Sequence, residues 1–167
     1  MTLIVRNNLW PVIRANLRLA NKSRVAIGFP GDMPKTNAQH GNSGMTNGQL
    51  AILNEVGTAP GVQQVNTPRP FVKETVKRHG GDLLNKATEQ LKMISRGEQS
   101  TLRALTGLGK IGADKVQATI VDSPSWAVAN TDFTKAKKRS STPLIDSMVM
   151  HNSVSYKVRM RGSQGQG

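Results

Sequence analysis

Apolar positions recur every three or four residues over much of this chain, which is the spacing of amphipathic helices. Pro11 lies in the first turn of the earliest such stretch, where a missing backbone N–H does least harm. Thr46 or Asn47 can cap a shorter helix, and Gly57 supplies its C-terminal stop. The predicted helices span residues 8–21, 47–57, 71–96 and 100–121.

Glycines interrupt the apolar pattern of the two longer helices. Gly80 and Gly81 each cost about 1 kcal/mol in a helix interior, so we expect a bend there. Gly109 and Gly112 lie on the apolar face of the last helix and should let another backbone come close. The positions predicted to form the apolar stripes are Val72, Val76, Leu83, Ala87, Leu91 and Ile94, then Leu102, Leu105, Val116 and Ile120.

Two short runs have the character of strands. Residues 24–29 form an apolar run that Pro30 ends, and residues 153–160 alternate between polar and apolar positions. The polar stretches 31–48 and 122–142 are predicted as long loops, the first of them mobile in the isolated protein. Helices and non-adjacent strands without a βαβ rhythm indicate an α+β fold, with a small antiparallel sheet packed against two or three helices. The alternating apolar positions are Val154, Tyr156 and Val158.

The length and charge of the chain add to this outline. Its 167 residues suit one domain, predicted over 1–161 with a flexible tail at 162–167. Lys and Arg number 23 against 10 Asp and Glu, a net charge of +13, which indicates a polyanion or an acidic partner. The basic run before the last strand comprises Lys135, Lys137, Lys138 and Arg139. We expect this run to contact DNA or an acidic neighbour, the alternative being solvated surface charge.

No group of residues marks a catalytic or metal site in this sequence. The chain has no cysteine, and His40, His79 and His151 lack the spacing of a shared metal ion. Asp146 and Ser147 precede His151, but no nucleophile turn surrounds the serine. No run approaches the roughly twenty apolar residues that a membrane span needs. The sequence therefore predicts no enzyme activity, no cofactor and no membrane segment.

Four motifs occur in order along the chain. They are QLAILNEVGT at 49–58, TPRPFV at 67–72, a segment opened by Leu108-Gly109 and reaching Val116-Gln117, and PLIDS at 143–147 followed by NSVSY at 152–156. In this order they resemble a family of tailed-bacteriophage neck and tail-completion proteins, over roughly residues 25–158. The resemblance implies a small α+β virion protein that forms a six- or twelvefold ring between the capsid portal and the tail.

The chain departs from the family pattern at three places. Met148 replaces a glycine, which argues against a turn of positive φ at that position. Val56 replaces an aromatic residue before Gly57, which weakens one core contact, and residues 126–138 diverge from the loop that the family has there.

The resemblance also implies partners and site residues. The partners would be further copies of the chain, portal or adaptor and tail proteins, and genomic double-stranded DNA contacted without reading its sequence. The protein would reside in the virion and, during assembly, in the host cytoplasm. The candidates for an interface or anchor are Pro68, Arg69, Pro70, Phe71, Pro143, Leu144 and Ile145. The last three could instead pack within the core of the subunit.

Three alternatives to a head-to-tail connector stay open from the sequence. Within the same family, the chain could be a tail terminator that caps the tail tube. The charge alone would also suit a free, sequence-independent DNA-binding protein, although its few aromatic residues give no stacking platform. A hydrolase that acts during infection, using Asp146 and His151, is the third alternative.

Overall fold

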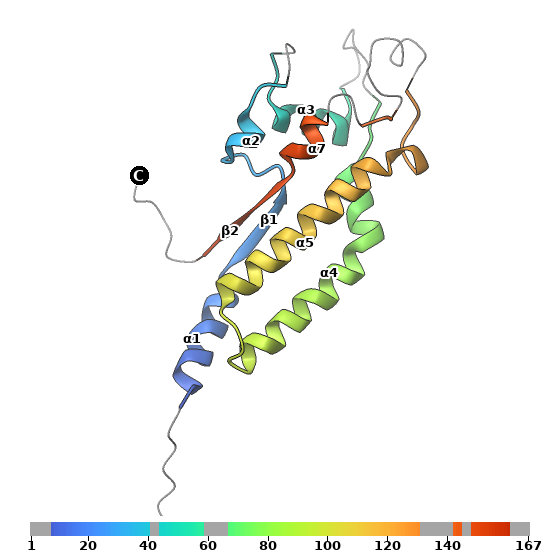
Figure 1. Cartoon of the computed structure of the whole chain (residues 1–167). Coiled ribbons are helices and arrows are strands. Elements are labelled where there is room, and N and C mark those ends of the chain that lie inside the picture. The colour runs from blue at the N-terminus through green and yellow to red at the C-terminus, as the bar shows by residue number, and fades with distance from the viewer. Residues whose placement is uncertain (1–7, 41–43, 59–66, 131–141, 145–147, 161–167) are drawn as a thin grey trace, which may run out of the picture.

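The computed structural model describes residues 8–40, 44–58, 67–130, 142–144 and 148–160. The basic run at 135–139, Ile145, Asp146, Ser147 and the tail at 162–167 lie outside these residues. Within them, the elements labelled in Figure 1 are α1 (Trp10–Ala20), β1 (Arg24–Gly28), α2 (Pro34–Asn37), α3 (Asn47–Val56), α4 (Phe71–Ser95), α5 (Thr101–Val121), the 3₁₀ turn η1 (Ser123–Ser125), α7 (Val149–Ser153) and β2 (Ser155–Arg159).

Helix α5 lies at the centre of the molecule, between α4 on one side and the two strands on the other (Figure 1). Helices α4 and α5 run antiparallel, joined by a short connection in which Gly97 has φ +75°. Helix α1 lies at one end of this arrangement, whereas α2, α3 and α7 lie at the other end. The predicted α+β class is confirmed, because helices pack on one small antiparallel sheet.

The two strands pair antiparallel in one register. Val25 lies opposite Val158, and Ile27 lies opposite Tyr156. Because side chains alternate across a strand, these four share one face of the sheet. That face packs on α5: a Cβ at Gly109 would lie 2.2 Å from the Tyr156 ring, and one at Gly112 would lie 2.3 Å from Ile27. The prediction that another backbone comes close at these glycines is therefore only partly correct, because two strand side chains fill the space.

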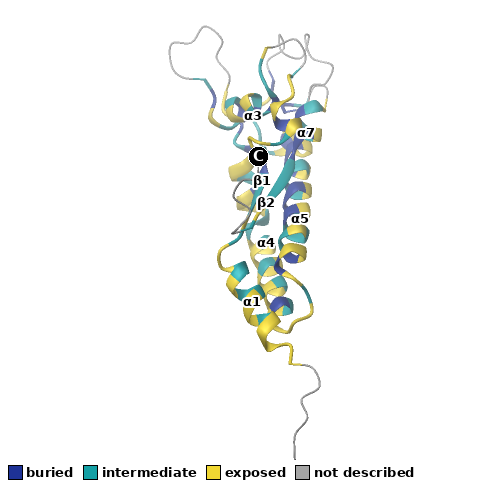
Figure 2. Cartoon of the chain, turned by 90° about the vertical axis from the view of Figure 1, so that its left-hand side faces the viewer, coloured by how far each residue is buried: buried dark blue, intermediate teal, exposed yellow. Residues whose placement is uncertain are grey.

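The buried core follows the inner face of α5 and continues toward α3, as the dark residues of Figure 2 show. Phe71 is fully buried, and its ring meets the Phe29 ring edge-on at a centroid distance of 5.9 Å. The core members are Ala51, Phe71, Ala113, Val116, Ile120, Leu144, Met150 and Val154. Helix α5 therefore contributes three members to one core, and Tyr156 of β2 packs against that core, as their apolar patterns predicted.

The prediction that residues 31–48 form one polar loop is wrong for the described part of that stretch. Pro34–Asn37 forms the short helix α2, and Gln39 bridges to Thr46. Asn47 is buried, and its side-chain N–H groups donate to the backbone oxygen of Lys35 and to Ser153 Oγ, each at 2.9 Å. Buried polar groups need such partners, so hydrogen bonds rather than apolar packing order this segment.

The apolar stripe predicted for α4 is also partly wrong. Phe71, Thr75 and Ile94 are the buried residues of this helix. Val72, Val76 and Leu91 are exposed, as is Leu102 on α5. The helix continues through Gly80 and Gly81 without interruption.

Met148 takes the positive φ that its replacement of a glycine argued against. Its φ is +59° and its ψ is 0°, in the left-handed region, and it immediately precedes α7. A left-handed conformation costs a non-glycine residue about 1–2 kcal/mol. The turn is therefore kept in this chain at some cost in stability.

The predicted start of the last strand at residue 153 is wrong. Helix α7 includes Ser153, and strand β2 begins at Ser155.

Candidate functional site

Two of the sequence motifs meet at the junction of α3 and α4. The backbone N–H of Arg69 donates to the carbonyl oxygen of Asn54 at 2.6 Å. The Glu55 carboxylate accepts from the backbone N–H groups of Val72 and Lys73, at 2.9 and 3.2 Å. Because Pro70 has no side-chain acceptor, Glu55 provides the cap for the first turn of α4 and places negative charge at its positive end.

Arg69 is a buried cation at the same junction. Its Nε donates to the Val128 carbonyl and a terminal guanidinium nitrogen donates to Asn130 Oδ1, both at 3.1 Å. Burial lowers the pKa of Arg69. The side chain therefore holds the segment after η1 against the start of α4, and it is not exposed to a neighbouring molecule.

The C-terminal motif joins the same end of the molecule through α7. Asn47 binds Ser153 as described, and the Asn54 side-chain amide lies 3.6 Å from Met150 Sδ. Leu144 is buried in the core cluster. Motifs about a hundred residues apart in sequence therefore share contacts in space.

These positions decide which interface candidates remain exposed. Four of the candidates are buried within the chain itself: Arg69, Phe71, Pro143 and Leu144. Pro143 and Leu144 therefore pack in the core of the subunit, which was the alternative to an interface role. Of the other candidates, Pro68 is exposed and Pro70 is half-buried, whereas Ile145 lies outside the described residues.

A cavity of about 360 Å³ opens next to the α3–α4 junction. Its apolar wall includes Ile27, Phe29, Ile52, Phe71 and Val72, which come from the end of β1, from α3 and from the start of α4. Among the described residues that line it, Glu55 is the one charged side chain, although the chain as a whole carries a net charge of +13. The wall therefore favours an apolar guest with a cationic edge.

Thr36 places an unsatisfied polar group in this cavity wall. The residue is 3% exposed, and its hydroxyl oxygen is itself buried and has no hydrogen-bond partner among the described residues. An unpartnered buried hydroxyl costs roughly 1–3 kcal/mol. Gly48 lies beside Thr36, where a Cβ would come within 2.7 Å of the Thr36 methyl group.

Exposed apolar side chains gather at both ends of the molecule. At one end, Trp10 on α1 is 61% exposed, and Val12 is similarly exposed. At the other end, Ile52 is 64% exposed beside Val56, at the rim of the cavity. Figure 2 shows the exposed residues along α1. Large exposed apolar side chains in clusters mark interaction surfaces.

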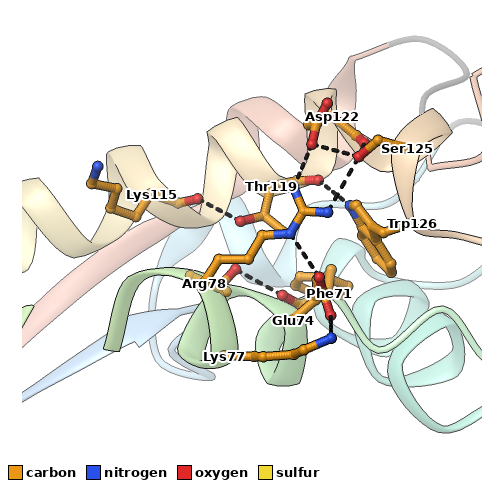
Figure 3. A network of polar contacts seen from close by, with 10 residues as sticks. Phe71, Glu74, Lys77, Arg78, Lys115, Thr119, Asp122, Ser125 and Trp126 are labelled. Atoms are coloured by element: carbon orange, nitrogen blue, oxygen red, sulfur yellow. Dashed lines mark hydrogen bonds and ion pairs between the residues drawn. The ribbon is translucent and has the colours of Figure 1, made fainter. Parts of the chain in front are cut away.

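A polar network connects α4 to the C-terminal end of α5 (Figure 3). Arg78 Nε binds Glu74 at 2.6 Å, and its terminal nitrogens bind Asp122 at 2.5 Å and Ser125 Oγ at 3.2 Å. The contacts with Glu74 and then Asp122 raise the pKa of Arg78, and the Arg78 guanidinium lowers the pKa of Glu74. The Ser125 hydroxyl and then Arg78 lower the pKa of Asp122. We call these four side chains the Arg78 network.

The face of the sheet that points away from α5 is basic. Arg24 lies directly opposite Arg159 in the register, and Lys157 lies on the same face. Asp32 pairs with Lys157 and, at 3.5 Å, with Arg159, and the Lys157 contact lowers the pKa of Asp32. We call Arg24, Lys157 and Arg159 the basic sheet face. It offers a cationic surface in the described structure, whereas the predicted run at 135–139 lies outside it.

The described residues hold neither a candidate metal site nor a candidate membrane span. No group of three or more His, Asp or Glu side chains there could hold a metal ion. No helix in that part of the chain is long and apolar enough to cross a membrane. Of the suggested Asp146–Ser147–His151 group, only His151 is described, and its Nδ1 lies 2.9 Å from Asn152 Oδ1.

Comparisons of the chain with protein-family models, curated proteins and solved structures returned no significant match.

The cavity, the Arg78 network and the basic sheet face were missed from the sequence. The cavity combines residues from four elements, so no local pattern marks it. The basic sheet face could have been found by pairing the two predicted strands antiparallel, which brings their charged positions onto one side.

Proposed function

We propose that this chain is a structural virion protein of a tailed bacteriophage, which forms a ring in the neck and joins head to tail around the DNA channel. The observation that carries the proposal is the convergence of the resembling motifs. Asn54 and Glu55 of the first motif bind the backbone of the second, and α7, which follows the 143–147 motif, binds α3. Chance matches along a sequence have no reason to share contacts in the fold.

The charge and surface of the chain are consistent with such a ring. A channel wall that meets a passing phosphate backbone gains from cations that read no bases, and the basic sheet face offers these. A ring needs two different contact surfaces on each copy. Exposed apolar residues at both ends of the molecule can supply them.

The test is to remove the gene for this chain from the phage that encodes it and to image the lysate by electron microscopy. We expect separate heads and tails, with joining restored by adding the purified protein. Mass spectrometry of purified wild-type particles should detect the chain in several copies per particle. Its presence in infected-cell extract but never in particles would contradict the proposal.

A sequence-independent DNA-binding protein is the second candidate, favoured by the basic sheet face. It predicts DNA binding by the monomer and normal particle joining when the gene is removed. The same deletion experiment therefore separates the two functions. A tail terminator would instead leave tails of abnormal length in the lysate.

A further inference from the structure

Two features at opposite ends of the molecule are complementary to each other. One is the exposed Trp10 near the start of α1, and the other is the cavity between β1, α2, α3 and α4 (Figure 1). Helix α5 runs between these two ends (Figure 1), and Trp10 is 61% exposed. Complementary patches on different parts of one chain make head-to-tail contacts between copies.

Size and polarity favour an aromatic side chain as the guest. A volume of about 360 Å³ lies at the low end of the roughly 300–1,000 Å³ typical of small-molecule pockets, which suits one large side chain. Two phenylalanines, Phe29 and Phe71, contribute to its wall. Tryptophan also carries one N–H donor that needs an acceptor when buried, and the cavity wall includes the polar side chains of Asn37, Thr46 and Gln49.

Charge points to the same pairing. Arg14 follows Trp10 by four residues, so the two lie on one face of α1, and α1 contains no acidic residue. Glu55 is the one charged residue among the described residues of the cavity wall. Its carboxylate already accepts two backbone N–H groups and keeps further lone pairs for a cation.

From these observations we propose that Trp10 of one copy of the chain inserts into the α3–α4 cavity of the next copy, with Arg14 beside Glu55. The contact is head-to-tail, so it repeats from copy to copy and closes into a ring where the rotation per copy allows. This inference rests on the ring-forming part of the proposed function and names the contact that would build the ring.

The experiment uses two variants of the full chain that each damage one side of the contact. Trp10→Ala removes the inserted side chain, and Ile52→Lys places a charge at the rim of the cavity. Both residues are well exposed, so both variants should fold normally, which circular dichroism checks. Leu84→Lys is the matched control, because Leu84 is an exposed apolar residue of α4 outside the cavity wall.

Sedimentation velocity over a concentration series should show oligomers for the wild type and for Leu84→Lys. Each damaged variant alone should associate at least tenfold more weakly. An equimolar mixture of the two should form one-to-one dimers and nothing larger, because only the intact cavity of Trp10→Ala and the intact tryptophan of Ile52→Lys can meet. Full assembly by both damaged variants would overturn the inference and leave the ring proposal standing.

Two further outcomes would also overturn the inference. One is a mixture that behaves as two separate monomers, and the other is a wild-type chain that stays monomeric at every concentration. The particle experiment then decides the neck function independently.

Tryptophan fluorescence gives a second readout, because Trp10 is the sole tryptophan in a Trp126→Phe background. Its emission should shift to shorter wavelength on association, and adding Ile52→Lys should remove that shift.

Discussion

The Tyr156 ring fills the space where any side chain at Gly109 would stand, with its Cδ2 atom 2.2 Å from the position of a Cβ. This contact fixes the distance between β2 and α5. An isolated two-stranded sheet is at best marginally stable in water, so the stability of the sheet depends on its packing against α5. Substitutions at different glycines of α5 should therefore have opposite effects on the stability of the protein.

We expect Gly109→Ala to destabilise the protein, because forcing a methyl group into a packed core costs about 1–3 kcal/mol. Gly107→Ala is the matched control: a Cβ there meets open space, and alanine is preferred in a helix by about 1 kcal/mol. Urea denaturation should therefore show a lower midpoint for the first variant and a higher midpoint for the second. Equal midpoints would show that β2 does not seat on α5 as described.

Met148 gives a second prediction, because it holds a left-handed conformation before α7. We expect Met148→Gly to raise the free energy of unfolding by about 0.5–1 kcal/mol, since glycine takes this conformation without a steric penalty. Met148→Val should lower it by more than 1 kcal/mol, because a β-branched residue is a clear outlier at positive φ. Thermal melts of the three proteins should give melting temperatures that decrease in the order glycine, methionine, valine at position 148.

The Arg78 network predicts a pH dependence of stability. The folded-state pKa values of Glu74 and Asp122 are lowered, so each carboxylate contributes stability that is present above its unfolded pKa and lost as pH falls through the folded one. The melting temperature of the wild type should therefore fall as pH drops below about 4. Arg78→Gln should be less stable at neutral pH and show a shallower acid decline.

Lys77→Gln is the control for that experiment. Lys77 also faces Glu74, at 3.8 Å, but its side chain is 77% exposed and makes no link to Asp122. Exposed pairs of this kind contribute little to stability. The melting temperature of Lys77→Gln should therefore change with pH as that of the wild type does. Parallel acid profiles for the Arg78 variant and the wild type would mean that the network does not stabilise the α4–α5 contact.

Periodicity located the helices and strands where apolar spacing is strong. Helix α5 begins and ends within one residue of its prediction, and β1 within one residue as well. Composition failed between residues 31 and 48, because Asn47 orders this segment through a hydrogen bond to Ser153, 106 residues away. Composition does not distinguish a polar residue that has specific buried partners from a polar residue that is exposed to solvent.

The candidate site was predictable only in part for a related reason. Val72 and Val76 have the spacing of core residues, but spacing shows only that a face is apolar. It does not show whether that face meets the same chain or another protein. The motifs pointed to Glu55 and Arg69 without indicating their contacts. The Thr36 hydroxyl left no sequence signal, because its lack of a partner is a property of the folded surroundings.

The basic sheet face leads to the last prediction, which concerns DNA. Arg24 and Arg159 lie directly opposite each other, and like charges in that position destabilise a sheet. Asp32 offsets this repulsion in part, because it pairs with Arg159 at 3.5 Å and with Lys157. Changing both to Gln should weaken binding to double-stranded DNA of any sequence and should reduce the slope of log K against log salt by about 2. Lys73→Gln with Lys77→Gln removes the same charge from α4, on the other side of α5, and should leave the slope nearly unchanged. Equal slopes for the two double variants would mean that DNA responds to net charge alone, and that the sheet face has no special part in binding it.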